Sequence, residues 1–331
     1  MAINRLVTLL LIMSLLSSVV LLGCQTNNFQ TAKVTKVASR INTQALSQQE
    51  LLQTLTNYEW QLVQIKDINN KTKPFNYHPP LLMQVIPNRL LFSEGCHTYQ
   101  SFFNETYQRP YAYRLSPPID GTNKPCTDGS DSDTRAALTT LIKPYVTEFR
   151  FDWLSKPNTP AKIALIMNNG VALIFDGRAK PDKKMLGLPI TNELLEYYNW
   201  RLMSVADKED QIIERFNQPD VPIISRFTTD EYRRFARYSV SCNGAGGPYA
   251  LTDNYKLLIG GAPSTMISCG ERMDKIESDF RRLISYSQSQ LVLTKTTSNT
   301  NNADTNDKSH YQLVQKMDSG ETLVWESEEK N

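Results

Sequence analysis

The strongest constraint on the fold of this chain is an internal repeat. The hexapeptide YEWQLV, beginning at Tyr58, recurs as YNWRLM, beginning at Tyr198, 140 residues further on. Three further landmarks recur in the same order at offsets of 146, 143 and 150 residues: Cys96 as Cys242, Cys126 as Cys269, and ALIF from Ala172 as TLVW from Thr322. Because unrelated matches would scatter over many offsets, the sequence predicts two homologous domains.

The repeat also sets the expected domain boundaries. We predict one domain over residues 51–178 and another over residues 190–327, joined by a linker of residues 179–189 rich in Lys, Pro and Gly. Residues 24–50 are rich in Thr, Asn, Gln and Ser without a sustained apolar period, which is typical of a flexible tether. The polar run Thr294–Ser309 is predicted to be a disordered hairpin insertion, with a specific binding loop as the alternative.

Short, strand-like segments bounded by Pro, Gly, Asn and Asp dominate both repeats. One segment in each repeat instead carries apolar residues at helical spacing. These are Leu138, Leu141, Ile142 and Tyr145 in the first repeat, and Met273, Ile276, Phe280, Leu283 and Ile284 in the second. The predicted fold class is therefore mainly β, each domain being a curved antiparallel sheet or open barrel packed on one helix.

The N-terminus has the layout of an export signal. One arginine, Arg5, is followed by the apolar run Leu6–Leu22, then Gly23 and Cys24. This order predicts a signal peptide over residues 1–23. The LLGC ending resembles the bacterial lipobox, in which the cysteine receives a diacylglycerol and becomes the first residue of the mature protein. The alternative is an uncleaved membrane anchor, for which 17 apolar residues lie at the short limit.

Cys24 is thus the predicted lipidation site, and the residue after it indicates the membrane. In the sorting rule of Gram-negative lipoproteins, Asp at this position retains the protein in the inner membrane, whereas here it is Gln25. We therefore expect a lipid anchor in the outer membrane, facing the periplasm. The formal net charge of +2 over 331 residues is too small to indicate a nucleic-acid partner.

The four remaining cysteines are expected to be oxidised, because the periplasm supports disulfides. Four cysteines allow three pairings, and the common repeat offset favours Cys96–Cys126 and Cys242–Cys269 over pairing between repeats. There is no Cys-x-x-Cys pair, and the three histidines lie far apart in sequence, so we predict no metal and no cofactor. A thiolate of Cys96 activated by His97 is disfavoured, because adjacent strand residues face opposite ways.

Two segments admit an alternative interpretation. The run SCNGAGG from Ser241 could be taken for a phosphate-binding loop, but it has no lysine and no strand-to-helix context, so a tight turn is favoured. The run DEYRRFARY from Asp230 mixes three arginines with aromatic residues. A solvated strand face is favoured there, and an anionic partner remains the alternative.

Three motifs of the second repeat carry a family resemblance. They are Trp-Arg-Leu from Trp200, Ser-Cys-Asn-Gly from Ser241, and Ser-Thr-Met-Ile-Ser-Cys from Ser264 to Cys269. Together they resemble the META domain of HslJ-like envelope proteins. The first repeat departs from this pattern: it has His97 in place of the Asn and keeps only Cys126 of the last motif. The resemblance implies a compact curved sheet with one helix, stabilised by the cysteine pairs and the tryptophan, and it implies no catalytic reaction.

Three functions follow as hypotheses. The preferred one is a non-catalytic, lipid-anchored module that binds or stabilises an unknown envelope protein. The second is a pilot-like or carrier protein that holds an apolar ligand or a partner helix in the mouth of the sheet. The third, an envelope hydrolase, has the least support, because no nucleophile, base and acid occur at a recognisable spacing.

Overall fold

A computed structural model describes most of both repeats. The described residues are 48–76, 78–95, 97–105, 113–115, 119–120, 147–156, 159–180, 186–229, 233–240, 242–261, 264–265, 267–296 and 310–330. Cys24, Cys96 and Cys126 lie outside the described residues. So do the predicted signal peptide, most of the tether, the predicted helix of the first repeat and most of the 294–309 run.

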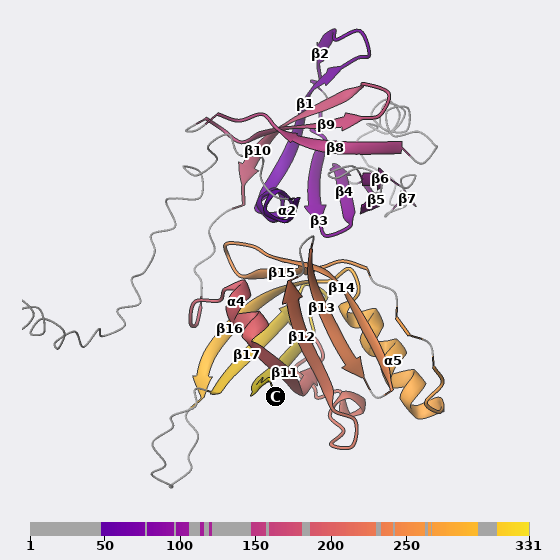
Figure 1. The fold of residues 1–331 in the computed structure, drawn as a ribbon, viewed down its shortest axis with the longest axis vertical. Helices are drawn as coiled ribbons and strands as arrows, with labels where there is room; N and C mark the ends of the chain where they lie inside the picture. The colour runs from indigo at the N-terminus through magenta and orange to yellow at the C-terminus, as the bar shows by residue number, and fades with distance from the viewer. Residues whose placement is uncertain are drawn as a thin grey trace, which may run out of the picture. The chain divides into compact units, whose positions relative to one another are not determined.

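The first repeat forms a sheet that closes on itself, here called the first barrel (Figure 1). Its elements are α2 (Gln48–Thr56), β1 (Tyr58–Lys66), β2 (Thr72–Pro74), β3 (Leu82–Ile86), β4 (Arg89–Glu94), β5 (His97–Glu105), β6 (Tyr113–Leu115), β7 (Ile119–Asp120), β8 (Thr147–Trp153), β9 (Lys162–Met167) and β10 (Ala172–Ala179). The strands run β1-β3-β4-β5-β6-β8-β9-β10, and β10 pairs back onto β1 from Tyr58↔Ala179 to Lys66↔Ala172. Strand β2 adds to β1, and β7 adds to β5.

The second repeat forms the second barrel (Figure 1). Its elements are α4 (Asn192–Tyr197), β11 (Tyr198–Ala206), the 3-10 turn η2 (Glu214–Phe216), β12 (Ile223–Thr229), β13 (Arg234–Val240), β14 (Asn243–Leu251), β15 (Lys256–Ile259), α5 (Glu271–Ile284), β16 (Gln288–Thr296), β17 (His310–Met317) and β18 (Thr322–Glu329). Each strand pairs antiparallel with the next, and β18 pairs with β11 to complete eight strands.

The predicted fold class is confirmed, since two mainly β, antiparallel units follow one another along the chain. The predicted helix of the second repeat is α5. The sheets are closed rather than open as expected, because in each unit the last strand pairs along its length with the first. Within the part of the chain that the structure describes, no helix has both the length and the apolar character needed to cross a membrane.

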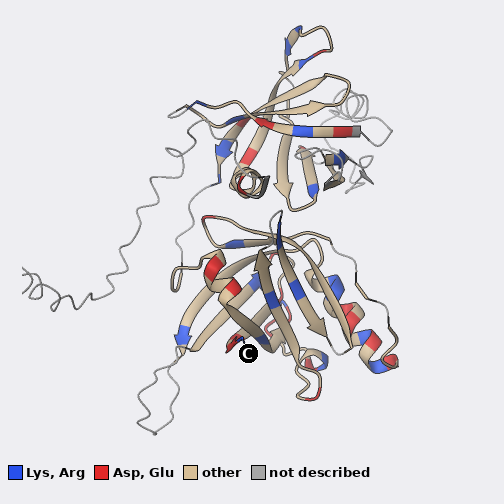
Figure 2. Ribbon diagram, viewed as in Figure 1, with Lys and Arg blue, Asp and Glu red and all other residues tan. Residues whose placement is uncertain are grey.

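Side chains fill the interior of the second barrel. Strand residues alternate, so that β18 turns Leu323, Trp325 and Ser327 inward. The Trp325 ring lies 6.1 Å from Tyr238 and 6.4 Å from Phe280, measured between centroids. Phe280 comes from α5, so this helix is held by an aromatic side chain inserted among the inward-facing residues. The opposite face of α5 carries charges of both signs (Figure 2).

Each barrel begins with the same arrangement, a short helix that accepts a hydrogen bond from the tryptophan of the first strand. The Trp60 Nε1–H donates to the Leu55 carbonyl at 2.9 Å, and the Trp200 Nε1–H donates to the Leu195 carbonyl at 3.0 Å. The last carbonyls of a helix have no partner within the helix. The buried indole therefore satisfies its own donor and one of these carbonyls with a single bond.

The turn after the first strand has the same side-chain hydrogen bonds in both barrels. The Asp67 carboxylate accepts from the backbone N–H of Asn69 and Lys71, both at 2.9 Å. The Asp207 carboxylate accepts from Glu209 at 3.0 Å and from Gln211 at 2.9 Å. Both first strands also shift register at the same point, after Leu62 and after Leu202. The sequence repeat is thus a structural repeat, even where the residues differ.

Replacement of Trp200 by Phe tests the helix-to-tryptophan bond. Trp200→Phe keeps an aromatic ring but leaves the Leu195 carbonyl unpaired, so we expect the free energy of unfolding to fall by about 1 to 3 kcal/mol. Urea unfolding followed by circular dichroism measures this change. Met203→Ala, on the outer face of the same strand and 40% exposed, is the control and should change the value by less than about 0.5 kcal/mol. Equal stability of the two variants would contradict this role.

Candidate functional site

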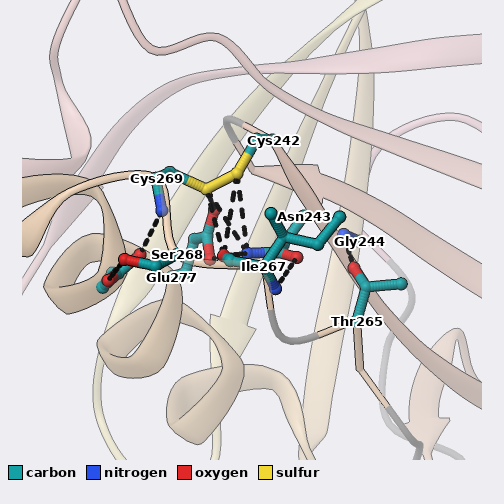
Figure 3. The surroundings of a disulfide bond; sticks show 9 residues. Cys242, Asn243, Gly244, Thr265, Ile267, Ser268, Cys269 and Glu277 are labelled. Carbon is teal, nitrogen blue, oxygen red and sulfur yellow. Dashed lines mark hydrogen bonds between the residues drawn. A yellow bond between two sulfur atoms is a disulfide. The ribbon is translucent and has the colours of Figure 1, made fainter.

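The candidate site lies where β14 begins beside α5, around a disulfide (Figure 3). Cys242 immediately precedes β14, and Cys269 lies two residues before α5. The two cysteines form a disulfide, with their Cα atoms 6.2 Å apart. The predicted pairing of Cys242 with Cys269 is therefore confirmed, whereas the Cys96–Cys126 pairing lies outside the described residues and remains a prediction.

Asn243, the first residue of β14, is the polar centre of this site. Its side chain is buried, with 8% of the residue exposed. The Oδ1 atom accepts from the Ile267 backbone N–H at 3.0 Å, and the Nδ2 group donates to the Ile267 carbonyl at 2.6 Å. Nδ2 also donates to Oε2 of Glu277 on α5 at 2.6 Å. One amide thus holds a strand, a loop and a helix together.

Two further contacts fix the loop that leads into α5. The Asp274 carboxylate accepts from the Cys269 backbone N–H and from the Ser268 hydroxyl, both at 2.8 Å. The Thr265 hydroxyl accepts from the Gly244 backbone N–H at 3.0 Å. Residues of the family-like motifs therefore meet here, and their polar atoms are engaged in holding the loop.

Glu277 is the residue that sequence reasoning missed. Its Oε1 atom lies 3.4 Å from the Cys269 Sγ. Neither sulfur of a disulfide carries a hydrogen, so this oxygen gains no hydrogen bond from Cys269. A search for Cys-x-x-Cys pairs and histidines could not find Glu277, because helix α5 supplies it from eight residues beyond Cys269. The only sequence signal is helical spacing, which places Asp274, Glu277 and Arg281 near one face.

A pocket of about 290 Å³ lies beside these residues, between β14 and α5. Its apolar lining comes from Val240, Ala245 and Ile267, and its charged lining comes from Asp274, Glu277 and Arg281. The Arg281 guanidinium donates to the Ser264 hydroxyl at 2.6 Å. This mixed lining suits a small polar group or a peptide side chain better than an acyl chain.

The polar groups described at this site are engaged with one another or with the backbone. Among its described residues, the two sulfurs are joined to each other and the hydroxyls of Thr265 and Ser268 are engaged with the backbone or with Asp274. No described histidine lines the pocket.

The two ambiguous segments resolve as parts of the sheet. Gly244, Gly246 and Gly247 lie within β14, so the expected tight turn is wrong for these residues. A side chain at Gly246 would clash with the Ala236 carbonyl and approach the Phe235 ring, which explains a glycine within this strand. In the arginine-rich run, the residues from Arg234 onward form β13, with Arg237 exposed and over the Phe235 ring.

Comparison with known proteins assigns no function. The sequence matches no protein-family model and no curated protein. A protein from Burkholderia xenovorans, with a structure from NMR, is similar over 46% of this chain and 97% of its own, with 19% identity and a TM-score of 0.31. A protein of unknown function from the DUF3598 family of Nostoc punctiforme is similar over 86% of this chain and 99% of its own, with 10% identity and a TM-score of 0.20.

Replacement of Asn243 by Ala tests whether this amide holds the site together. Asn243→Ala removes the bonds to Ile267 and leaves the half-buried Glu277 without its donor, so we expect a loss of about 2 to 4 kcal/mol in the free energy of unfolding. Asn217→Ala, at an exposed position, is the matched control and should cost less than about 0.5 kcal/mol. Urea unfolding of both variants measures the difference, and similar costs would show that Asn243 has no such role.

Proposed function

We propose that this chain is an outer-membrane lipoprotein with two META/HslJ-like domains, acting as a non-catalytic binding module of the bacterial envelope. Cys24 would carry the lipid, and Gln25 favours the outer membrane. The lipid would hold the barrels at the periplasmic face, where their partner is another envelope component. The observation that carries this proposal is the pocket beside α5, which is lined by residues of two of the three motifs of the second repeat, those that begin at Ser241 and Ser264.

The rim of this pocket offers a contact surface. Ile267 is 63% exposed although its backbone is fixed on both sides by Asn243. Because the backbone that carries this apolar side chain is already fixed, a partner that covers it has less conformational freedom to remove, which favours binding. Arg281 and Glu277 in the pocket can then select the polar groups of that partner.

The alternative function, a pilot-like protein or a carrier of an apolar ligand, is supported less well. A carrier of an acyl chain needs an apolar cavity large enough to enclose it. In the second barrel, the inward-facing space is occupied by Trp200, Trp325, Tyr238 and Phe280, each at most 2% exposed. A partner helix could still lie on the surface beside α5 without disturbing this packing. Of the alternative functions, we therefore retain only the binding of a partner helix on the surface.

Photo-crosslinking in intact cells tests the proposed surface. A photoreactive amino acid at Ile267 should give a crosslinked adduct with an envelope component, because this side chain would lie in the contact. The matched control is Ile68, which is 66% exposed, belongs to the first repeat and does not line the pocket, and it should give no such adduct.

A second control addresses the anchor. The variant Cys24→Ala cannot receive the lipid, so it should lose labelling by radioactive palmitate and should lose the Ile267 adduct if membrane attachment brings the partner within reach. Equal adducts at Ile267 and Ile68, or no adduct at Ile267, would contradict the binding surface. Palmitate labelling that persists in Cys24→Ala would contradict the anchor.

A further inference from the structure

We propose that the Cys242–Cys269 pair, once reduced, forms a binding site for a thiophilic divalent cation such as Zn²⁺, with Glu277 as the third ligand. From the sequence we predict only a structural disulfide at these cysteines. The metal site needs a carboxylate that the fold, rather than the sequence spacing, brings to the sulfurs.

The geometry is close to that of a metal site. The two Sγ atoms and a Glu277 carboxylate oxygen lie within 4.8 Å of one another. Zinc bonds of about 2.3 Å to sulfur and 2.0 to 2.2 Å to oxygen, in tetrahedral geometry, require ligand atoms about 3.5 to 3.8 Å apart. Glu277 Oε1 already lies 3.4 Å from the Cys269 Sγ. Cleavage of the disulfide lets the sulfurs separate by the remaining distance, about 1.7 Å.

The charge balance also favours a cation. Two thiolates and a carboxylate would place three negative charges within 4.8 Å of one another, and like charges so close disfavour their own ionised forms. Among the described residues, no lysine or arginine forms an ion pair with Glu277, whose side chain instead contacts Asn243 and Cys269. A divalent cation would neutralise this repulsion. It would also bind Glu277 Oε1, which receives no hydrogen bond from the disulfide.

Asn243 supplies the support that a metal ligand needs. Its Nδ2 group donates to Glu277 Oε2 at 2.6 Å, which leaves Oε1 directed at the sulfur. Hydrogen bonds of this kind orient a ligating carboxylate and tune its affinity for the metal. With three protein ligands, a fourth coordination position remains for water.

Reduction of the disulfide requires two electrons and two protons, which a dithiol reductant can supply. The reductant transfers two electrons and two protons to the Cys242–Cys269 bond and is itself oxidised to a disulfide, leaving two thiols on this chain. Binding of the cation then releases the two thiol protons to solvent. Cys242 is exposed, so a thiolate of the reductant can reach its sulfur.

Cobalt titration of the full mature protein tests the proposal. A phosphine reductant opens the disulfide without adding competing thiols, and Co²⁺ gives a thiolate charge-transfer absorption when bound by cysteine. We expect saturable binding of Co²⁺ by the reduced protein and no thiolate band in the oxidised protein. Cys242→Ser should weaken binding at least about 100-fold, and Glu277→Gln should weaken it about 10- to 100-fold.

Two matched variants make the result decisive. Glu271→Gln, at an exposed position in the first turn of α5, should bind Co²⁺ as the unchanged protein does. The same titrations in a protein that also carries Cys96→Ser and Cys126→Ser remove the contribution of the other two thiols. If that protein does not fold, Glu277→Gln is compared with Glu271→Gln in the protein that keeps all its cysteines. Equal affinity of the Glu277→Gln and Glu271→Gln variants would overturn the proposal, since thiols of an unfolded chain would bind without Glu277. The crosslinking at Ile267 uses the oxidised protein, so the two tests can fail independently.

Discussion

The pairing of the last strand of each repeat with the first is the constraint on which the rest of the structure depends. An open sheet exposes a row of unpaired N–H and C=O groups at each edge. Closure pairs β10 with β1 and β18 with β11, so that the first and last strands of each unit are not left as sheet edges. Each barrel is therefore complete only when its final strand is in place. The first and last landmarks of each repeat, the tryptophan strand and the final apolar strand, are partners in the same ladder.

Closure also decides where function can lie. Once eight strands enclose a fixed space, that space is filled by inward-facing aromatic side chains, including Phe280 from α5. Recognition must then use the outside and the ends of the barrel, as is common for sites held on a rigid scaffold. The second barrel meets this requirement at the start of β14, where the disulfide and Asn243 fix the loop before α5. The same rigidity holds Glu277 against a sulfur with which it cannot form a hydrogen bond.

The features that sequence analysis could predict depend on local signals. The periodicity of Met273, Ile276 and Phe280 predicts α5, and the shared offset predicts the Cys242–Cys269 pair. The short helices α2 and α4 were not predicted, because nine and six residues carry too little periodicity, although Thr191 does cap α4. Barrel closure and the contact of Asn243 with Glu277 join residues that are distant in sequence, so only packing brings them together. The glycines of β14 resemble a turn in the sequence. The groups that require a glycine at Gly246, the Phe235 ring and the Ala236 carbonyl, lie on the neighbouring strand β13 and are not evident from the sequence.

The central claim is that one closed β unit is used twice, each copy stabilised within itself and exported to an oxidising compartment. The most direct measurement is disulfide mapping by mass spectrometry, on protein whose thiols are blocked in intact cells before extraction. The account predicts one linked peptide pair containing Cys242 and Cys269 and another containing Cys96 and Cys126. A peptide that links a cysteine of the first repeat to one of the second, or four free thiols, would contradict it.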